Sequence, residues 1–460
     1  MKHTQIISQN QTVSVEKLGL LANIFSEFKI GSMLNAAGIT KTKGAGPLAI
    51  FTIVFNLAFT GKNFFQGVVR DKSTRIGKDA VYNFLNSPTY NWRRFTLLLA
   101  VKIHLLIRSL LDAPAEEEVL IFDDSLYSRD RSKKVELLSK VFDHNSKKYL
   151  KGFRLLTLGW SDGNSFLGLD FAILSSANQK NRYNGITKTL DKRTCGYRRR
   201  QEAMTKSTDL LEPMVKRAFS AGIRAKYLLM DSWFSAPSII SALRKHVDII
   251  CMLKDHPNWR YEYKGHKLRL RDLYSKISKK RGKAKVKASV VIKMPDGKNA
   301  RIIFVPGDKK RGWLALLCTD IALAGEEIIR LYGKRWDIEV FFKMCKQHLK
   351  LVKEIQIRDF DGLIGHTSMV FARYNILSWF QRQQVDHRSF GDLFRTCNNE
   401  LENLKFIDAL QRIIQMARAM IQKTGTMSKK VVQAIMDAVM GAAIIFFGFS
   451  SDKSNLISEH

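Results

Sequence analysis

Four side chains that can contact phosphates or metal ions recur at fixed intervals between residues 332 and 346. Arg335, Glu339 and Lys346 follow Tyr332 at offsets of 3, 7 and 14 residues. At about 100° per residue, a helix would place all four within roughly 60° of one another. The resulting stripe carries a phenol, a guanidinium, a carboxylate and an ammonium. A solvated helix face with ion pairs has the same appearance, so residues elsewhere must decide its role.

Two further carboxylates follow short apolar runs that are typical of buried strands. Asp123 comes after Val119–Phe122, and Asp231 comes after Tyr227–Met230. Because strand ends in an α/β sheet meet at one edge, we expect both aspartates and Glu339 to converge there. Converging carboxylates repel one another and favour a hard cation such as Mg²⁺ or Mn²⁺. Two such ions would suit an in-line phosphoryl displacement, whereas a strand-ending aspartate can also be an ordinary turn cap.

The elements that position these residues fall into three regions. Residues 1–114 are mostly helical. Within them a short helix over Lys78–Leu85, a turn at Ser87-Pro88 and a basic helix over Tyr90–Leu110 suit a helical DNA-binding domain. Residues 115–380 alternate strands with helices and contain a basic, mainly β insertion at about 252–318. The stripe lies in the proline-free segment 323–351, for which we predict one long helix. Residues 381–460 are predicted to be helical again.

Charge is the strongest global signal. The chain of 460 residues has 76 Lys and Arg against 42 Asp and Glu, a formal net charge of +34. Such a charge favours a polyanionic partner, and we predict DNA. The longest apolar runs, Leu48–Phe59 and Ala438–Phe449, are too short to span a bilayer, so no membrane partner is expected. The five cysteines show no C-x-x-C pair, which argues against a zinc module and fits a reducing cytoplasm.

Two other groups of residues support less specific interpretations. The polar segment Gln179–Lys206 includes Arg198, Arg199 and Arg200, and we predict an exposed loop that can lie along phosphates. The tryptophans at 233 and 336 are interpreted as packing residues.

The spacing Tyr332-x2-Arg335-x3-Glu339-x6-Lys346 resembles the YREK signature of the IS4 family of bacterial DDE transposases. The sequences IFDDS around Asp123, LLMDSWFS around Asp231 and RWDIEVFFKMCKQHLKL from Arg335 onward resemble the three blocks that carry the D, D and E of that family. The resemblance extends over roughly residues 75–380. It implies an α/β fold with a ribonuclease-H-like catalytic core and a β-rich insertion, flanked by helical N- and C-terminal domains.

The resemblance also implies roles for individual residues. Asp123, Asp231 and Glu339 would be the catalytic triad that binds two Mg²⁺ or Mn²⁺ ions. Three residues would hold the phosphates of the transposon end: Tyr332, Arg335 and Lys346. Trp313 resembles a tryptophan that receives a flipped base in related enzymes, and a core tryptophan at a strand edge is the alternative.

The first aspartate has a neighbour that could replace it, because Asp124 follows Asp123 directly and side chains alternate along a strand. Asp123 is preferred because it keeps the family's spacing of Asp, one residue, then Ser or Thr, which here is Ser125. Asp124 remains the alternative.

The implied function is that of a transposase of a bacterial insertion sequence. It would bind the element's terminal repeats, cut DNA with metal ions, with hairpin ends as one route, and transfer the strands to target DNA. Pairing two ends implies a homodimer, with residues 381–460 as candidates for the contact, in the bacterial cytoplasm beside the nucleoid. The alternatives are a ribonuclease-H-like nuclease without end preference and a catalytically inactive DNA-binding descendant.

Overall fold

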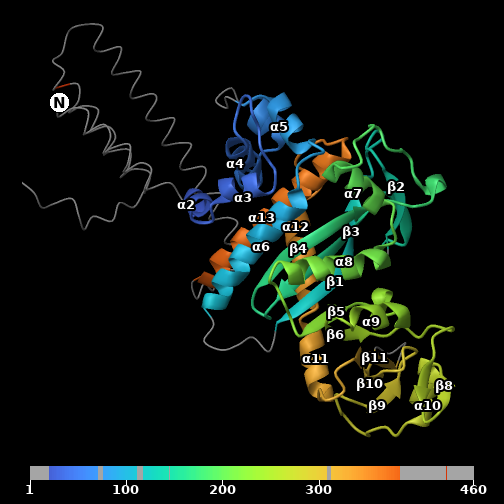
Figure 1. Cartoon of the computed structure of the whole chain (residues 1–460). Coiled ribbons are helices and arrows are strands. Elements are labelled where there is room, and N and C mark those ends of the chain that lie inside the picture. The colour runs from blue at the N-terminus through green and yellow to red at the C-terminus, as the bar shows by residue number, and fades with distance from the viewer. Residues whose placement is uncertain are drawn as a thin grey trace, which may run out of the picture. The chain divides into compact units, whose positions relative to one another are not determined.

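The structure is a computed structural model that describes residues 20–70, 76–110, 118–143, 146–307, 312–383 and 431. Residues 22–396 form one compact unit, and a second unit combines residues 1–21 with 397–460. The elements below belong to the described part, nearly all of it in the larger unit (Figure 1). The predicted C-terminal helical region and its dimer contact lie almost wholly outside the described residues. The boundaries proposed at 114 and 380 stay predictions.

The centre of the molecule is one mixed sheet of eleven strands. Its strands are β1 (Val119–Ser128), β2 (Ser139–Asp143), β3 (Lys148–Ser161), β4 (Phe166–Leu174), β5 (Tyr227–Met230), β6 (Asp248–Met252), β7 (Tyr261–Tyr263), β8 (His266–Leu268), β9 (Ala288–Lys293), β10 (Asn299–Pro306) and β11 (Trp313–Cys318). The path through the sheet is β2-β3-β1-β5-β6-β11-β10-β9-β7-β8, and β4 pairs with β3.

Five of these strands form a mixed parallel and antiparallel core. β4, β3 and β1 are antiparallel neighbours, and β5 and β6 continue from β1 in parallel. The order β4-β3-β1-β5-β6 with these directions is that of a ribonuclease-H-like fold. The predicted fold class, an α/β core of this type with a β-rich insertion, is confirmed.

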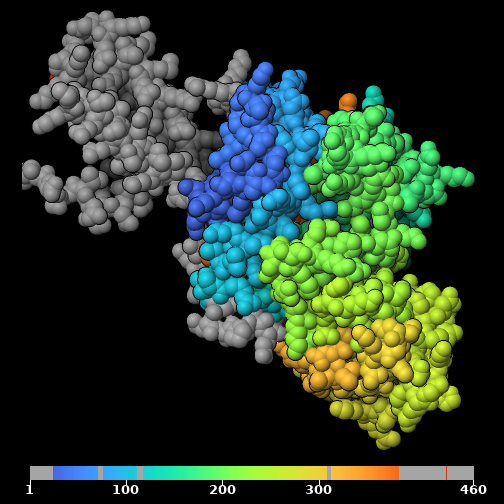
Figure 2. Space-filling view, viewed as in Figure 1, coloured from blue at the N-terminus to red at the C-terminus, as the bar shows by residue number. Residues whose placement is uncertain are grey.

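The insertion joins the core through the sheet itself. Strands β7 to β11 and the short helix α10 (Leu270–Lys276) lie between β6 and the next core helix. β11 pairs with β6 through three residue pairs, Leu316↔Met252, Leu317↔Cys251 and Cys318↔Ile250. Figure 2 shows the insertion as a yellow lobe beside the green core.

The other regular elements of the described residues are helices. They are α2 (Leu20–Glu27), α3 (Ile30–Ala36), α4 (Pro47–Leu57), α5 (Lys78–Leu85), α6 (Trp92–Ser109), α7 (Cys195–Ala203), α8 (Ser207–Ser220), α9 (Pro237–Leu243), α11 (Gly325–Gly333), α12 (Trp336–Gln347) and α13 (Phe360–Gln383), with short turns η1 (Ala58–Thr60), η2 (Phe65–Val69), η3 (Gln179–Asn181) and η4 (Ser232–Phe234). Across the described residues, no helix is both long and apolar enough to cross a membrane.

Strand β4 is buried along its whole length because helices pack on both of its faces. Phe171 meets Phe371 of α13, with ring centroids 4.8 Å apart. Asp170 accepts hydrogen bonds from Arg93 of α6 at 2.9 Å and from Arg217 of α8 at 2.7 Å. The helix that begins at Trp92 is therefore tied to the core sheet.

The stripe from 332 to 346 does not lie on a single helix. The predicted helix over 323–351 is divided into α11 and α12, with a turn at Lys334 and Arg335. Gly333 ends α11, and glycine is a poor residue for a helix interior. Tyr332 therefore belongs to α11, Arg335 precedes α12, and the other two residues of the stripe lie on α12. The prediction of one continuous helix is wrong.

The segment Gln179–Lys206 also differs from its prediction. It is exposed through most of its first half, but it ends in α7, where Arg199 and Arg200 are only 6% and 1% exposed. The prediction of an exposed basic loop is wrong for these two arginines, whereas Lys192, Arg193 and Arg198 are exposed as expected.

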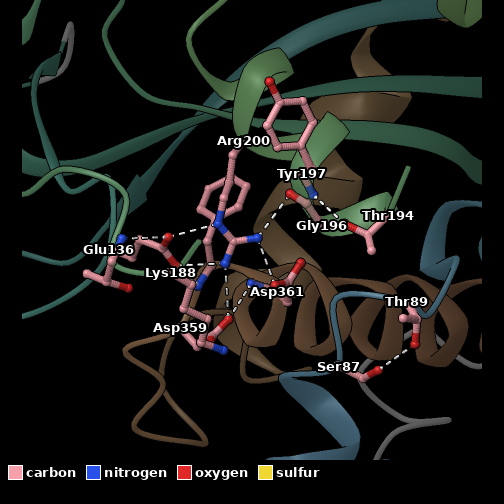
Figure 3. Close-up of polar contacts among 12 residues, drawn as sticks. Ser87, Thr89, Glu136, Lys188, Thr194, Gly196, Tyr197, Arg200, Asp359 and Asp361 are labelled. Atoms are coloured by element: carbon pink, nitrogen blue, oxygen red, sulfur yellow. Dashed lines mark hydrogen bonds and ion pairs between the residues drawn. The ribbon is translucent and has the colours of Figure 1, made fainter. Parts of the chain in front are cut away.

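Arg200 is buried because distant carboxylates neutralise it (Figure 3). Its guanidinium donates two hydrogen bonds of 2.8 Å to Glu136, one of 2.7 Å to Asp361 and one of 3.0 Å to the carbonyl of Gly196. Asp359 lies 3.5 Å from the same guanidinium and also pairs with Lys188. The network connects α7, the segment after β1 and the start of α13.

Candidate active site

The two predicted aspartates are neighbours because of the strand register. The parallel pairing of β1 with β5 ends at Phe122↔Met230, so Asp123 and Asp231 are the next residues on adjacent strands. β1 itself continues to Ser128 because its antiparallel partner β3 continues. The prediction that the strand ends at Phe122 is wrong, but the parallel ladder does end there. Both aspartates line one cleft of about 1390 Å³.

Asp123 and Asp124 have different partners. The Asp123 carboxylate accepts a 3.3 Å hydrogen bond from Arg335 and a 2.8 Å hydrogen bond from the backbone N–H of Asp124. The Asp124 carboxylate accepts a 3.1 Å hydrogen bond from Arg154. Both residues line the cleft, so the preference for Asp123 as the metal ligand stays a prediction.

The environment of Asp123 opposes its negative charge. Burial raises its pKa to about 7, and the nearby carboxylates of Asp124 and Asp231 act in the same direction. The Arg335 guanidinium partly offsets these effects. An additional cation at this edge of the sheet would therefore favour the ionised carboxylate.

Arg335 connects Asp123 with Glu339. Its guanidinium hydrogen-bonds to the Glu339 carboxylate one helical turn later and to Asp123 on β1. It also lies over the ring of Tyr332, 5.9 Å from the ring centroid. The Tyr332 hydroxyl is buried without a hydrogen-bond partner among the described residues, and burial raises its pKa. Three of the four stripe residues thus meet at the end of the parallel ladder.

The donor set fits a hard divalent ion, because its oxygens come from carboxylates without a histidine or cysteine partner. Among the residues that the structure describes, however, no three His, Cys, Asp or Glu side chains are grouped closely enough to hold a metal ion. Glu339 reaches Asp123 through the Arg335 guanidinium, which takes the place of a cation between them. The assignment of Asp123, Asp231 and Glu339 as a metal-binding triad remains a prediction.

Lys346 and Trp313 also line the cleft. The Lys346 ammonium donates a 2.6 Å hydrogen bond to Ser125, two residues after Asp123, and burial lowers its pKa. Trp313 is half-buried, and its ring centroid lies 5.0 Å from that of Tyr274 and 5.2 Å from that of Phe304. Both side chains can therefore meet a ligand in the cleft, but no contact here tests their predicted roles.

The cleft contains charged residues that sequence reasoning did not single out. Its charged lining consists of Asp123, Asp124, Asp143, Asp231, Asp255, Arg154, Lys206, Lys254, Arg271 and Lys346. Five acidic and five basic side chains balance formally, so the high net charge of the chain is not concentrated in the cleft. Arg154 could have been suspected from its place on the strand paired with β1, whereas Lys254 and Arg271 have no local signal.

Both tryptophans that were interpreted as packing residues are exposed. Trp233 is 57% exposed and Trp336 is 62% exposed, so that interpretation is wrong. Trp233 lines the cleft. Its position two residues after Asp231 was the signal that could have revealed it.

Comparison with known families covers most of this region. Residues 57–265 match the family model described as DDE superfamily endonuclease, and residues 188–376 match the model described as Transposase DDE domain. No curated protein matched the chain.

Solved structures that are similar to this chain include a nuclease, a transposase complex and one lobe of an Argonaute. Each is 10% identical to this chain in sequence. The NurA nuclease of Sulfolobus solfataricus has a TM-score of 0.23, with 56% of this chain and 83% of that chain covered. The Drosophila P element transposase strand transfer complex has a TM-score of 0.26, with 58% and 55% covered. The C-terminal lobe of a budding yeast Argonaute has a TM-score of 0.20, with 66% and 58% covered. These scores are low, so the fold assignment rests on the strand order.

The two family matches together span residues 57–376, which include the parallel strand ends, the cleft and both helices of the stripe. This part of the chain is therefore similar to DDE-type endonuclease and transposase domains.

Proposed function

We propose that the chain is an IS4-type transposase that cuts the ends of a bacterial insertion sequence and joins them to target DNA. One observation carries the proposal most strongly. The parallel ladder ends at Phe122↔Met230, which brings Asp123 and Asp231 together, and Arg335 links Glu339 to the same place. The predicted D, D and E therefore come from three distant segments to one edge of the sheet.

The roles of the residues follow from their chemistry. Asp123, Asp231 and Glu339 would hold Mg²⁺ or Mn²⁺, which when bound would activate the attacking oxygen and offset charge on the leaving oxygen. Arg335 offers a planar fork of donors for a phosphate. Tyr332 packs beside that guanidinium and limits its orientations. Lys346 would offer a point charge to the next phosphate.

The chain as a whole supplies the attraction for DNA. Its net charge of +34 favours long-range association with a polyanion. We propose that helices in residues 1–114 recognise the terminal repeats. The hydrogen bond from Arg93 of α6 to Asp170 connects these helices to the core. Two ends would be paired by a homodimer, with residues 381–460 as the proposed contact.

The test uses a plasmid that carries the encoding element with both of its ends and the full-length protein in Mg²⁺. We expect cuts at the element's ends and joined products, and we expect Asp231→Asn and Glu339→Gln to lose both while they bind DNA as the parent does. If either variant cut as well as the parent, the catalytic assignment would be wrong.

The same reactions decide between the alternatives. Cutting at many sites without joined products would indicate a nuclease, a reading that the DDE superfamily endonuclease match also allows. Binding without any cutting by the parent would indicate a DNA-binding descendant.

A further inference from the structure

One exposed aromatic side chain beside the carboxylates has no role in the arrangement described so far. Trp233 leaves 57% of its surface in contact with solvent and lines the cleft that contains Asp123 and Asp231. Leaving a large indole in water forgoes the free energy that its burial would supply. An exposed ring within a cleft is therefore available to stack against an aromatic or apolar ligand.

The turn that carries Trp233 is fixed on both sides. It is the short helix η4, whose first backbone N–H, that of Ser232, donates to the Asp231 carboxylate. Phe234 is only 1% exposed, and the Ser235 hydroxyl donates a 2.8 Å hydrogen bond to the carbonyl of Ser232. These contacts fix the backbone of the turn, so the Cα of Trp233 keeps a constant position next to Asp231 and the proposed reaction centre.

Positive charge lies beside the ring. The Lys254 ammonium is 5.8 Å from the Trp233 ring centroid and is exposed. Arg271, also in the cleft lining, is 77% exposed and pairs with Asp255 at 3.0 Å. An aromatic face with neighbouring exposed cations is the combination that binds single-stranded nucleic acid, because bases stack on the ring and phosphates meet the cations.

Trp313 differs from Trp233 in its exposure. Tyr274 and Phe304 already contact Trp313 closely, and the residue is half-buried at the start of β11. Trp233 is more exposed, and it lies two residues after Asp231 in the sequence. The two tryptophans belong to different walls of the cleft, one on the core and one on the insertion.

We propose that Trp233 stacks on an unpaired nucleobase of the DNA strand whose end is processed at Asp123 and Asp231, while Lys254 contacts the adjoining phosphate. The proposal rests on the proposed function, since it takes DNA as the substrate. Trp233 would thus give a frayed DNA strand a second aromatic contact in the cleft, in addition to the one expected from Trp313.

The experiment measures binding of DNA duplexes that have a short single-stranded end. The fluorescent base 2-aminopurine is placed at successive positions of that end, in buffer without added divalent cations so that the strand is not cut. We expect strong quenching at one position with the full-length parent. Trp233→Ala should remove that quenching and weaken binding of the frayed duplex about 10-fold, within the range for one stacked base. Trp233→Phe should restore part of both.

Trp336→Ala is the matched control, because Trp336 is similarly exposed at 62% but does not line the cleft. It should bind and quench as the parent does. A fully paired blunt duplex should show little difference between Trp233→Ala and the parent.

Two results would overturn the inference while leaving the proposed function intact. The first is parent-like quenching and affinity in Trp233→Ala, in a protein whose cutting still depends on Asp231. The second is equal loss on frayed and blunt duplexes, which would indicate a general structural effect. Tighter binding of an RNA strand of the same sequence would overturn DNA as the ligand. Conversely, Trp233-dependent quenching without any Asp231-dependent cutting would contradict the proposed function and keep the stacking site.

Discussion

Arg200 and Arg335 each connect carboxylates from different segments, but they do so in different surroundings. The side chains of Arg200 and its partners Glu136 and Asp361 are all 4% exposed or less. Those of Arg335, Asp123 and Glu339 are 16%, 17% and 36% exposed. Arg200 also donates to a backbone carbonyl, whereas the tyrosine beside Arg335 has a buried hydroxyl without a partner among the described residues.

The difference separates a structural network from one that is ready to change partners. A saturated, dry network costs free energy to disturb, because any lost partner leaves a buried charge uncompensated. A partly solvated network can exchange a carboxylate for a phosphate or a metal ion at lower cost. We infer that Arg200 holds the fold together and that Arg335 serves the site.

The largest effect is expected from Arg200→Met. The substitution leaves Glu136 and Asp361 buried without their counter-charge and should lower the free energy of unfolding by about 3–5 kcal/mol. Denaturant unfolding followed by circular dichroism measures this loss. Arg193→Met is the matched control, because Arg193 is 89% exposed in its pair with Asp191, and it should unfold at the parent's midpoint. An Arg200→Met protein as stable as the parent would remove the basis of the comparison.

Arg335→Gln should show the opposite behaviour. It removes a donor aimed at the reaction centre, so we expect cutting to fall about 10²-fold or more. The free energy of unfolding should change by less than about 1 kcal/mol, because its carboxylate partners keep contact with water. Cleavage rates and unfolding curves on one preparation test both parts. A large loss of stability with normal cutting would indicate that Arg335, like Arg200, holds the fold together.

Lys346→Ala should have a smaller effect that is specific to DNA. If Lys346 contacts one phosphate, binding should weaken about 10-fold at moderate salt, and the slope of log K against log salt should fall by about one. Lys343→Ala provides the control, since Lys343 is exposed on the same helix and does not line the cleft. Equal losses in both variants would indicate a general charge effect.

The smallest effect concerns acid stability of the Arg200 network. Burial alone would raise the pKa of Glu136, but hydrogen bonds from Arg200 and from the backbone N–H of Phe360 outweigh it and lower that pKa below its usual range. Its stabilisation is therefore present above the unfolded pKa of about 4.3 and is lost as pH falls through the folded value. Burial raises the pKa of Asp361 despite Arg200, so its contribution is lost as pH rises through the folded value.

The two substitutions should therefore change the pH dependence in opposite directions. Between about pH 3 and 5, Glu136→Gln should flatten the rise of stability with pH, and Asp361→Asn should steepen it. Unfolding free energies measured at several pH values for the parent and both variants check the signs. Parallel curves for all three proteins would show that the network does not titrate with folding.

Local patterns predicted the elements well where their ends are fixed locally. The short helix at 78–85 and the buried strand at 227–230 appear with the bounds expected from the sequence, because a turn or a polar residue ends each apolar pattern. Strand β1 exceeded its expected end because its length depends on β3, a partner more than twenty residues away. The break before α12 was missed although Gly333 precedes it, because the two residues of the turn, Lys334 and Arg335, are compatible with a helix.

The sequence predicted which residues belong to the candidate site, but it predicted few of the contacts between them. The convergence of Asp123 and Asp231 follows from parallel strands, which the sequence indicated. The link through Arg335 depends on how α12 packs against β1, and no periodicity shows which charged side chains will meet. The exposure of Trp233 and the burial of Arg200 depend in the same way on distant partners, which sequence patterns do not show.

The short pairing of β6 with β11 has a mechanical consequence. Three residue pairs join the insertion to the core within the sheet, and the cleft has Trp313 on one side of this seam and Asp231 on the other. Because α11 packs on both strands, the seam connects the position of the insertion to that of the core. The register of β6 with β11 thus sets the relative position of the two cleft walls.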